Sequence, residues 1–154
     1  MKIRKAHPED AAIIARFNTA MALETEDARL DPQVLLAGVR AILSDSTKGD
    51  YFVTESDGRV VGQIMITHEW SDWRNGDIWW VQSVYVDNEF RRRGVFRALY
   101  AHVRKLAIQN GAIGIRLYVD AHNHTGQKTY ISLGMRETNY KLMEEMFTPA
   151  QRGD

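Results

Sequence analysis

Four arginines surround one glycine in the stretch "DNEFRRRGVFRALY": Arg91, Arg92, Arg93 and Arg97 flank Gly94. At this point a run typical of a strand gives way to a run typical of a helix. The first N–H groups of a helix lack intrahelical partners and, together with the helix dipole, attract anions. A glycine lets a ligand approach the backbone closely, and guanidinium groups add charge-assisted hydrogen bonds. The stretch therefore predicts a binding site for a diphosphate.

A solvated basic helix start is the alternative explanation of this cluster. Cations are electrostatically unfavourable at a helix N-terminus, so we favour the anion site. The chain lacks the GxxxxGK[ST] and GxGxxG patterns, which leaves other diphosphate ligands such as coenzyme A. A nucleic-acid-binding domain is disfavoured because the 20 Lys and Arg residues balance the 20 Asp and Glu residues.

The composition limits the other classes of function. The 154 residues suit one domain, residues 1–154, with one core. The absence of cysteine excludes disulfides, thiolate nucleophiles and Cys-ligated metals. No apolar run is long enough for a signal peptide or a membrane span, so we expect a soluble, cytoplasmic protein without a membrane partner.

Apolar patterns with periods of 2 and 3.6 residues predict strands and helices along the whole chain. Asp57-Gly58 predicts a hairpin turn, and Pro8 and Pro32 mark two helix starts. The order β-α-α-β-β-β-α-β-α-β indicates an α/β (α+β) fold with helices on the faces of a mixed sheet. We expect strands near residues 2–6, 51–56, 59–67, 78–86, 113–119 and 135–146, and helices near 8–21, 32–42, 94–110 and 123–134. Parts of 135–146 would also tolerate a helix.

The segment "VYVDNEFRRRGVFRALY" resembles the acyl-CoA-binding motif of the GNAT superfamily of N-acetyltransferases. In that family a strand ends in an R/Q-x-x-G-x-G/A loop around the CoA diphosphate. Arg91 matches the first position and Gly94 the first glycine, whereas Phe96 stands where Gly or Ala is usual. The resemblance covers nearly the whole chain and implies a single GNAT-like domain with a mixed, mostly antiparallel sheet flanked by helices.

A second segment resembles the family pattern N-x-x-A-x-x-x-Y-x-x-x-G-F, with Gly126 and Met135 in place of the usual Ala and Phe. Acetyl-CoA is therefore the implied cosubstrate, with no metal. The strand residues also fit a role in the core alone, and Asn123 fits a helix N-cap equally well. The implied cofactor-binding residues are Val84, Tyr85, Val86, Arg91, Arg92, Arg93, Gly94, Val95, Phe96, Arg97, Asn123 and Tyr130.

Acetyl transfer needs a general acid for the thiolate and a free amine. Tyr130 is the candidate acid, because a phenol of pKa about 10 nearly matches a thiol of pKa about 8.5; simple packing is the alternative. Many family members place a Glu where Gln82 stands, and an amide takes up no proton. Glu69 is therefore our candidate base and acceptor-site residue, with Glu24 and His122 as alternatives, although a solvated loop carboxylate has the better odds for Glu69.

Two further groups of side chains remain open or are set aside. Trp70, Trp73, Trp79 and Trp80 fit a core, a wall of the acceptor pocket or a dimer interface, and a homodimer stays open. His68, His122 and His124 suggest a metal, but a third plausible ligand is lacking and we reject a metal site.

The acidic stretch "MALETEDARLD" places Glu24, Glu26, Asp27 and Asp31 between the first two predicted helices. The resemblance implies a lid over the acceptor site here, with Glu24 and Gln82 contacting the acceptor, although a solvated loop is as well supported. We expect acetyl transfer to a primary amine, of a small cationic molecule or of a protein. The alternative is a catalytically weak acyl-CoA sensor or regulatory module, which Gln82 favours.

Overall fold

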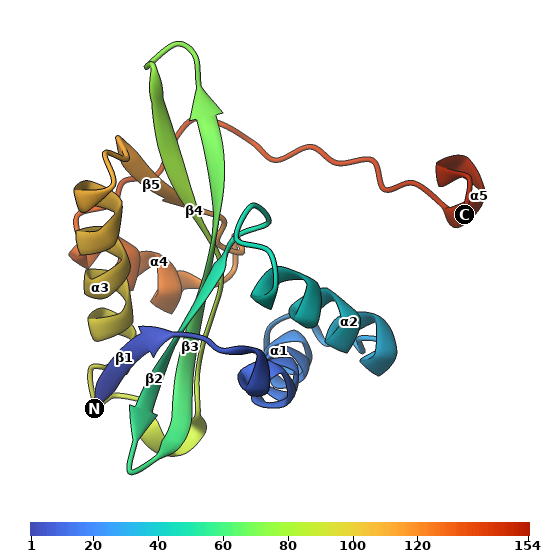
Figure 1. Ribbon diagram of the computed structural model, residues 1–154. Helices are drawn as coiled ribbons and strands as arrows, with labels where there is room; N and C mark the ends of the chain where they lie inside the picture. The colour runs from blue at the N-terminus through green and yellow to red at the C-terminus, as the bar shows by residue number, and fades with distance from the viewer. The chain divides into compact units, whose positions relative to one another are not determined.

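The computed structural model describes all residues from 1 to 154. The chain separates into two compact units, Met1–Tyr118 and Val119–Asp154, which are described separately. The prediction of one domain over residues 1–154 stays a prediction. The first unit contains β1 (Lys2–Lys5), η1 (Pro8–Asp10), α1 (Ala11–Glu26), α2 (Pro32–Leu43), β2 (Asp50–Ser56), β3 (Arg59–Ser71), β4 (Gly76–Val86), η2 (Asn88–Phe90), α3 (Val95–Gln109) and β5 (Gly114–Leu117) (Figure 1).

The strands of the first unit form one sheet in the order β1-β2-β3-β4-β5. Neighbouring strands are antiparallel except for β4 and β5, which are parallel because α3 crosses between them. Helices α1 and α2 cover one face of the sheet and α3 covers the other (Figure 1). The predicted α/β fold, with a mixed, mostly antiparallel sheet flanked by helices, is therefore confirmed.

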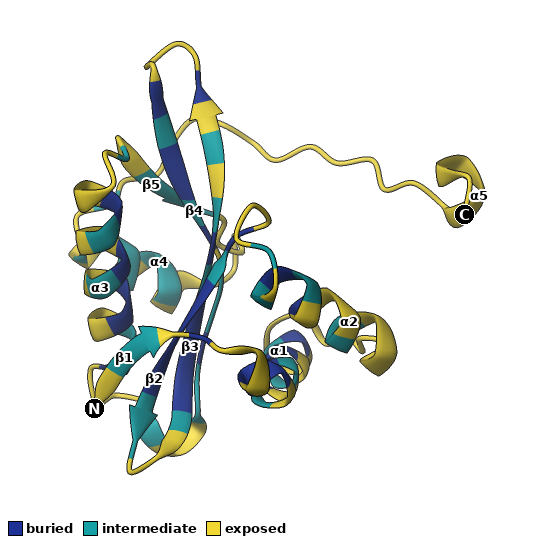
Figure 2. Cartoon of the chain, viewed as in Figure 1, coloured by how far each residue is buried: buried dark blue, intermediate teal, exposed yellow.

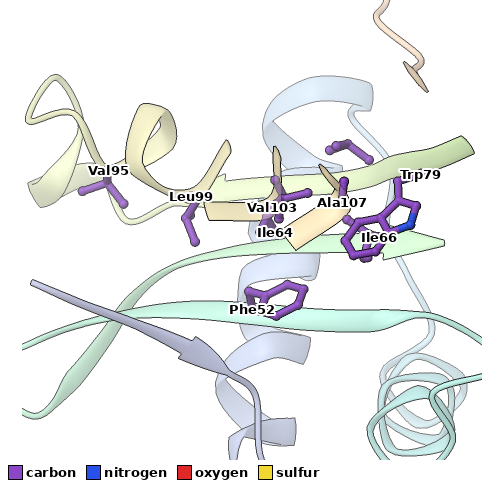
Figure 3. Close-up of a cluster of buried hydrophobic side chains, with 9 residues drawn as sticks. Phe52, Ile64, Ile66, Trp79, Val95, Leu99, Val103 and Ala107 are labelled. Carbon is purple, nitrogen blue, oxygen red and sulfur yellow. The ribbon is translucent and has the colours of Figure 1, made fainter. Parts of the chain in front are cut away.

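Helix α3 is held on its face of the sheet by a stripe of apolar side chains at helical spacing. Val95, Leu99 and Val103 are almost fully buried, and they pack against Ile64 and Ile66 of β3 (Figure 3). Only the sheet-facing side of α3 is buried (Figure 2). This packing fixes the start of the helix beside the end of β4.

Helix α1 is fixed to the opposite face by a chain of buried hydrogen bonds. Gln63 of β3 donates to Asn18 Oδ1 at 2.8 Å, and Asn18 donates to the Tyr51 hydroxyl of β2 at 3.0 Å. Gln63 is fully buried, and the bond from its Nε2 offsets part of the cost of removing its amide from water, whereas its Oε1 has no hydrogen-bond partner. They set the position of α1, and hence of Glu24 near its end.

Asp10 joins the first strand to the first helix through a buried ion pair. Its carboxylate accepts hydrogen bonds from Arg4 at 2.7 and 3.0 Å and from the His7 backbone N–H at 2.6 Å. These bonds, chiefly those from Arg4, hold the pKa of Asp10 below its ordinary value. The carboxylate therefore stabilises the fold above the unfolded-state pKa of about 3.9, and this stabilisation is lost as the pH falls through the lower folded-state pKa.

We expect Asp10→Asn to lower the free energy of unfolding by about 1–3 kcal/mol at pH 7, because Arg4 loses the more buried of its two carboxylate partners and retains Glu55, at 2.8 Å. Urea unfolding at several pH values measures this. The difference between wild type and variant should shrink as the pH falls from about 4, where the unfolded-state carboxyl takes up a proton, through the lower folded-state pKa. The exposed neighbour Glu9, changed to Gln, is the control and should have little effect. A cost for Asp10→Asn that does not vary with pH would show that packing, not charge, is responsible.

The second unit contains α4 (His124–Ser132) and α5 (Pro149–Arg152). The strand predicted near residues 135–146 is not formed, and residues 135–148 adopt neither helix nor strand. Tyr140, Leu142 and Met143 are exposed in this segment. An alternating pattern shows which face a strand would bury, but a strand also needs a partner for its backbone, which the pattern does not specify.

Candidate active site

The end of β4 has a free edge. β5 pairs with β4 only from Ile78 to Val81, whereas β4 continues to Val86. From Gln82 onward, β4 therefore has no strand partner on the side of β5. The predicted cofactor-binding residues Val84, Tyr85 and Val86 lie on this free part. The backbone groups here that point away from β3 are available to a ligand that lies along the strand, apart from the Val86 carbonyl, which accepts a hydrogen bond from Arg91.

A β-bulge lies at the beginning of this free edge. Ser83 is opposite Met65 of β3 and Val81 is opposite Ile66, so Gln82 is the extra residue. The Gln82 side chain is exposed and donates from Nε2 to the Thr67 hydroxyl at 2.9 Å. The Ser83 hydroxyl is buried without a hydrogen-bond partner. The bulge thus places two polar side chains in succession at the point where the strands separate.

Between β4 and α3 the backbone turns through two left-handed residues. Arg92 has φ +62° and Gly94 has φ +80°, and Gly94 is the N-cap of α3. No side chain caps the helix start, and a Cβ on Gly94 would meet no atom within 4 Å. Left-handed residues in such a turn direct successive N–H groups into a concave surface that suits anions. The strand–loop–helix arrangement predicted from the sequence is present.

The arginine side chains of the loop have separate partners. Arg91 donates from Nε to the Val86 carbonyl at 2.9 Å and from Nη2 to Glu24 Oε2 at 2.8 Å, and its guanidinium lies 5.2 Å from the Tyr85 ring centroid. The Arg93 guanidinium lies 5.2 Å from the centroid of the Phe90 ring. Arg92, Arg93 and Arg97 are exposed near the start of α3, as the prediction requires.

Glu24 lies at this loop, near the end of α1. Besides its ion pair with Arg91, its Oε1 accepts a hydrogen bond from the Tyr85 hydroxyl at 3.2 Å. Burial raises the pKa of Tyr85, and the neighbouring Glu24 carboxylate raises it further, so the phenol remains a donor at neutral pH. The sequence motif did not predict this contact, because 67 residues separate Glu24 from Arg91. The role of Glu24 toward an acceptor stays a prediction.

Glu69 lies within β3, where it is opposite Ile78, and not in a loop. Its carboxylate accepts a hydrogen bond from Arg116 of β5 at 3.2 Å and is partly exposed. Arg116 was not identified as a site residue, because nothing in its own strand marks it. The role of Glu69 as a base stays a prediction, with Arg116 as an added partner.

The four tryptophans have different environments. Trp79 is 7% exposed and belongs to the core, whereas Trp70 and Trp73, near the tip of the β3–β4 hairpin, are 64% and 88% exposed. Trp80 is half-buried and its ring centroid lies 4.6 Å from that of Tyr118. The core explanation therefore holds for Trp79 but not for Trp70 and Trp73.

In the second unit, Asn123 and Tyr130 lie on α4 or at its start. Asn123 is the N-cap, and its Oδ1 accepts a hydrogen bond from the Gly126 N–H at 2.9 Å. A Cβ at Gly126 would come within 2.5 Å of Asn123 Nδ2, so the glycine leaves room for this cap. Burial raises the pKa of the Tyr130 phenol. The N-cap role of Asn123 is confirmed, while its contact with a cofactor stays a prediction.

Comparison with known proteins places these features in a family. The sequence profile of the Acetyltransferase (GNAT) family matches residues 16–135. A solved structure described as "a possible acetyltransferase from Clostridium difficile 630" is 44% identical, with a TM-score of 0.90, over 96% of this chain and 97% of that chain. The comparison with curated proteins returned no match.

Two more distant structures share the fold. A ribosomal-protein-alanine N-acetyltransferase from Brucella melitensis biovar Abortus 2308 is 18% identical, with a TM-score of 0.76, over 96% of this chain and 100% of that chain. An aminoglycoside N-acetyltransferase in complex with CoA is 20% identical, with a TM-score of 0.78, over 94% of this chain and 93% of that chain. None of the helices here has the length and hydrophobicity that a membrane crossing requires.

Because the family profile matches residues 16–135, which is most of the chain, the chain belongs to the GNAT family of acetyltransferases.

Proposed function

We propose that the protein transfers an acetyl group from acetyl-CoA to a primary amine of a small cationic molecule. The observation that carries this proposal is the free edge of β4, which leads directly into the left-handed turn and the uncapped start of α3. A diphosphate joined to an extended amide chain suits these two features together, because one binds anions and the other binds backbone-like amides.

The residues fit acetyl-CoA in a definite way. The N–H groups of residues 92–97 and the side chains of Arg92, Arg93 and Arg97 would hold the diphosphate. The edge from Val84 to Val86 would bind the pantetheine amides. The Arg91 side chain remains a candidate ligand, but in this structure it bonds Val86 and Glu24.

Acetyl-CoA supplies the thioester carbonyl that an amine attacks. A backbone N–H on the free edge of β4 would polarise the carbonyl oxygen, as donors of an oxyanion hole do. Tyr130 would protonate the leaving thiolate, since burial keeps its phenol in the protonated form. Glu69 would accept the proton of the amine directly or through water, with Arg116 holding its carboxylate in place.

The test is release of free CoA thiol from acetyl-CoA over a panel of amines. The panel should contain polyamines, aminoglycosides, lysine derivatives and a peptide with an N-terminal alanine, because similar folds include an aminoglycoside and a ribosomal-protein-alanine acetyltransferase. We expect turnover with the small cationic amines. Turnover only with the peptide would assign a protein acceptor instead. Calorimetric binding of acetyl-CoA without turnover of any amine would support the sensor module, which the amide at Gln82 favours.

A further inference from the structure

Glu24 connects three parts of the proposed site through its two carboxylate oxygens. Oε1 accepts the hydrogen bond of Tyr85 from β4 at 3.2 Å, and Oε2 accepts that of Arg91 from the diphosphate-binding loop at 2.8 Å. Glu24 itself belongs to α1, which the buried bonds of Asn18 hold against the sheet. One carboxylate therefore joins the acidic segment after α1, the free strand and the loop.

The bond to Arg91 is the one of these attachments that is partly open to solvent. Both side chains of the pair are partly exposed, Arg91 by 41% and Glu24 by 38%, and exposed ion pairs contribute little to stability. Arg91 immediately precedes the left-handed Arg92, so its guanidinium lies at the edge of the concave turn. An anion bound in that turn is a second, doubly charged partner for the same guanidinium.

We propose that Glu24 and the diphosphate of acetyl-CoA compete for Arg91, so that binding of the cosubstrate releases the Glu24 carboxylate to the cationic amine. The inference rests on the proposed function and deepens it. When Arg91 turns to the diphosphate, the Tyr85 hydroxyl still holds Oε1, so the released carboxylate stays beside the reacting strand. Its charge is then no longer neutralised by Arg91.

Two consequences follow from the competition. Because linkage between binding sites is reciprocal, acetyl-CoA and the amine each raise the affinity for the other. Glu24 also has opposite effects on the two partners, since it opposes the binding of acetyl-CoA and favours the binding of a cation. A carboxylate that acts on the amine alone would leave the affinity for acetyl-CoA unchanged.

The test measures calorimetric affinity for CoA itself, which needs no acceptor. Glu24→Gln removes the competitor, so we expect CoA to bind about two- to fivefold more tightly at low salt, and less so as the salt concentration rises. Glu89→Gln is the matched control. Glu89 lies in the same loop region but pairs with Arg59 at 3.0 Å, and its substitution should change the affinity by less than about 1.5-fold.

A second background separates competition from a general effect of charge. In Arg91→Ala there is no guanidinium to compete for, so adding Glu24→Gln should leave the affinity for CoA as it is. Equal tightening with and without Arg91, or weaker or unchanged binding by Glu24→Gln alone, would overturn the proposal. Absence of CoA binding by the wild-type protein would instead refute the proposed function. Thermal unfolding of every variant establishes that the fold is intact.

Discussion

The Gly94→Asp variant should bind CoA about 10- to 100-fold more weakly than the Gly94→Asn variant. Both side chains tolerate a left-handed backbone, and a Cβ at this position meets no atom within 4 Å, so both variants should fold alike. They are almost the same size and differ in charge. The difference in affinity therefore isolates the repulsion between a carboxylate and an anion bound at the start of α3.

Isothermal calorimetry with CoA measures this difference, and dephospho-CoA, which retains the diphosphate, should show the same ratio. Thermal unfolding of the two variants checks that they are equally stable. Affinities of the Asp and Asn variants that are both close to that of the wild type would exclude the start of α3 as the diphosphate site. If both lose binding equally, the glycine matters for close approach of the ligand and not for charge.

Tyr130→Phe should lower kcat about 10²–10⁴-fold and leave the affinity for acetyl-CoA nearly unchanged. The phenylalanine keeps the ring but lacks the proton that the leaving thiolate would take. Because burial raises the pKa of Tyr130 above its ordinary value, the phenol stays protonated through neutral and mildly alkaline pH. The wild-type rate should therefore show no loss from titration of this group below about pH 10.

Steady-state kinetics with the best amine of the panel and a pH–rate profile test this role. Tyr140→Phe is the matched control, because Tyr140 lies in the same unit and is 74% exposed. It should retain the wild-type kcat. A kcat close to wild type for Tyr130→Phe would reduce Tyr130 to a packing residue and require another proton donor.

The regular elements of the first unit were predictable because each has its own periodicity. The stripe of Val95, Leu99 and Val103 predicted α3, and Asp57-Gly58 predicted the hairpin of β2 and β3. The loop around Gly94 was predictable for the same reason, since its residue types and their spacing lie within a single stretch. The residue types within one stretch were enough to predict the features that this stretch forms by itself.

Features that depend on distant residues were not predictable. No pattern in the sequence pairs Glu24 with Arg91 or Glu69 with Arg116, because each pair joins elements that meet only in the folded chain. The bulge at Gln82 depends on how β3 and β4 align, and alternation within β4 does not reveal it. The strand expected near residues 135–146 is absent for a related reason. A pattern of apolar residues does not supply a neighbouring strand to pair with its backbone.

The free edge of β4 also bears on how the protein avoids aggregation. An unpaired strand edge is a template on which another chain can extend a sheet, and Val84 and Val86 have side chains that favour such pairing. The bulge at Gln82 interrupts the edge, so that only Ser83 to Val86 continue regularly before the chain turns away at η2. A run this short makes few intermolecular hydrogen bonds, and the added twist of a bulge makes a flat partner fit poorly. The short, bulged edge that a ligand can reach is therefore also a poor template for edge-to-edge pairing of sheets.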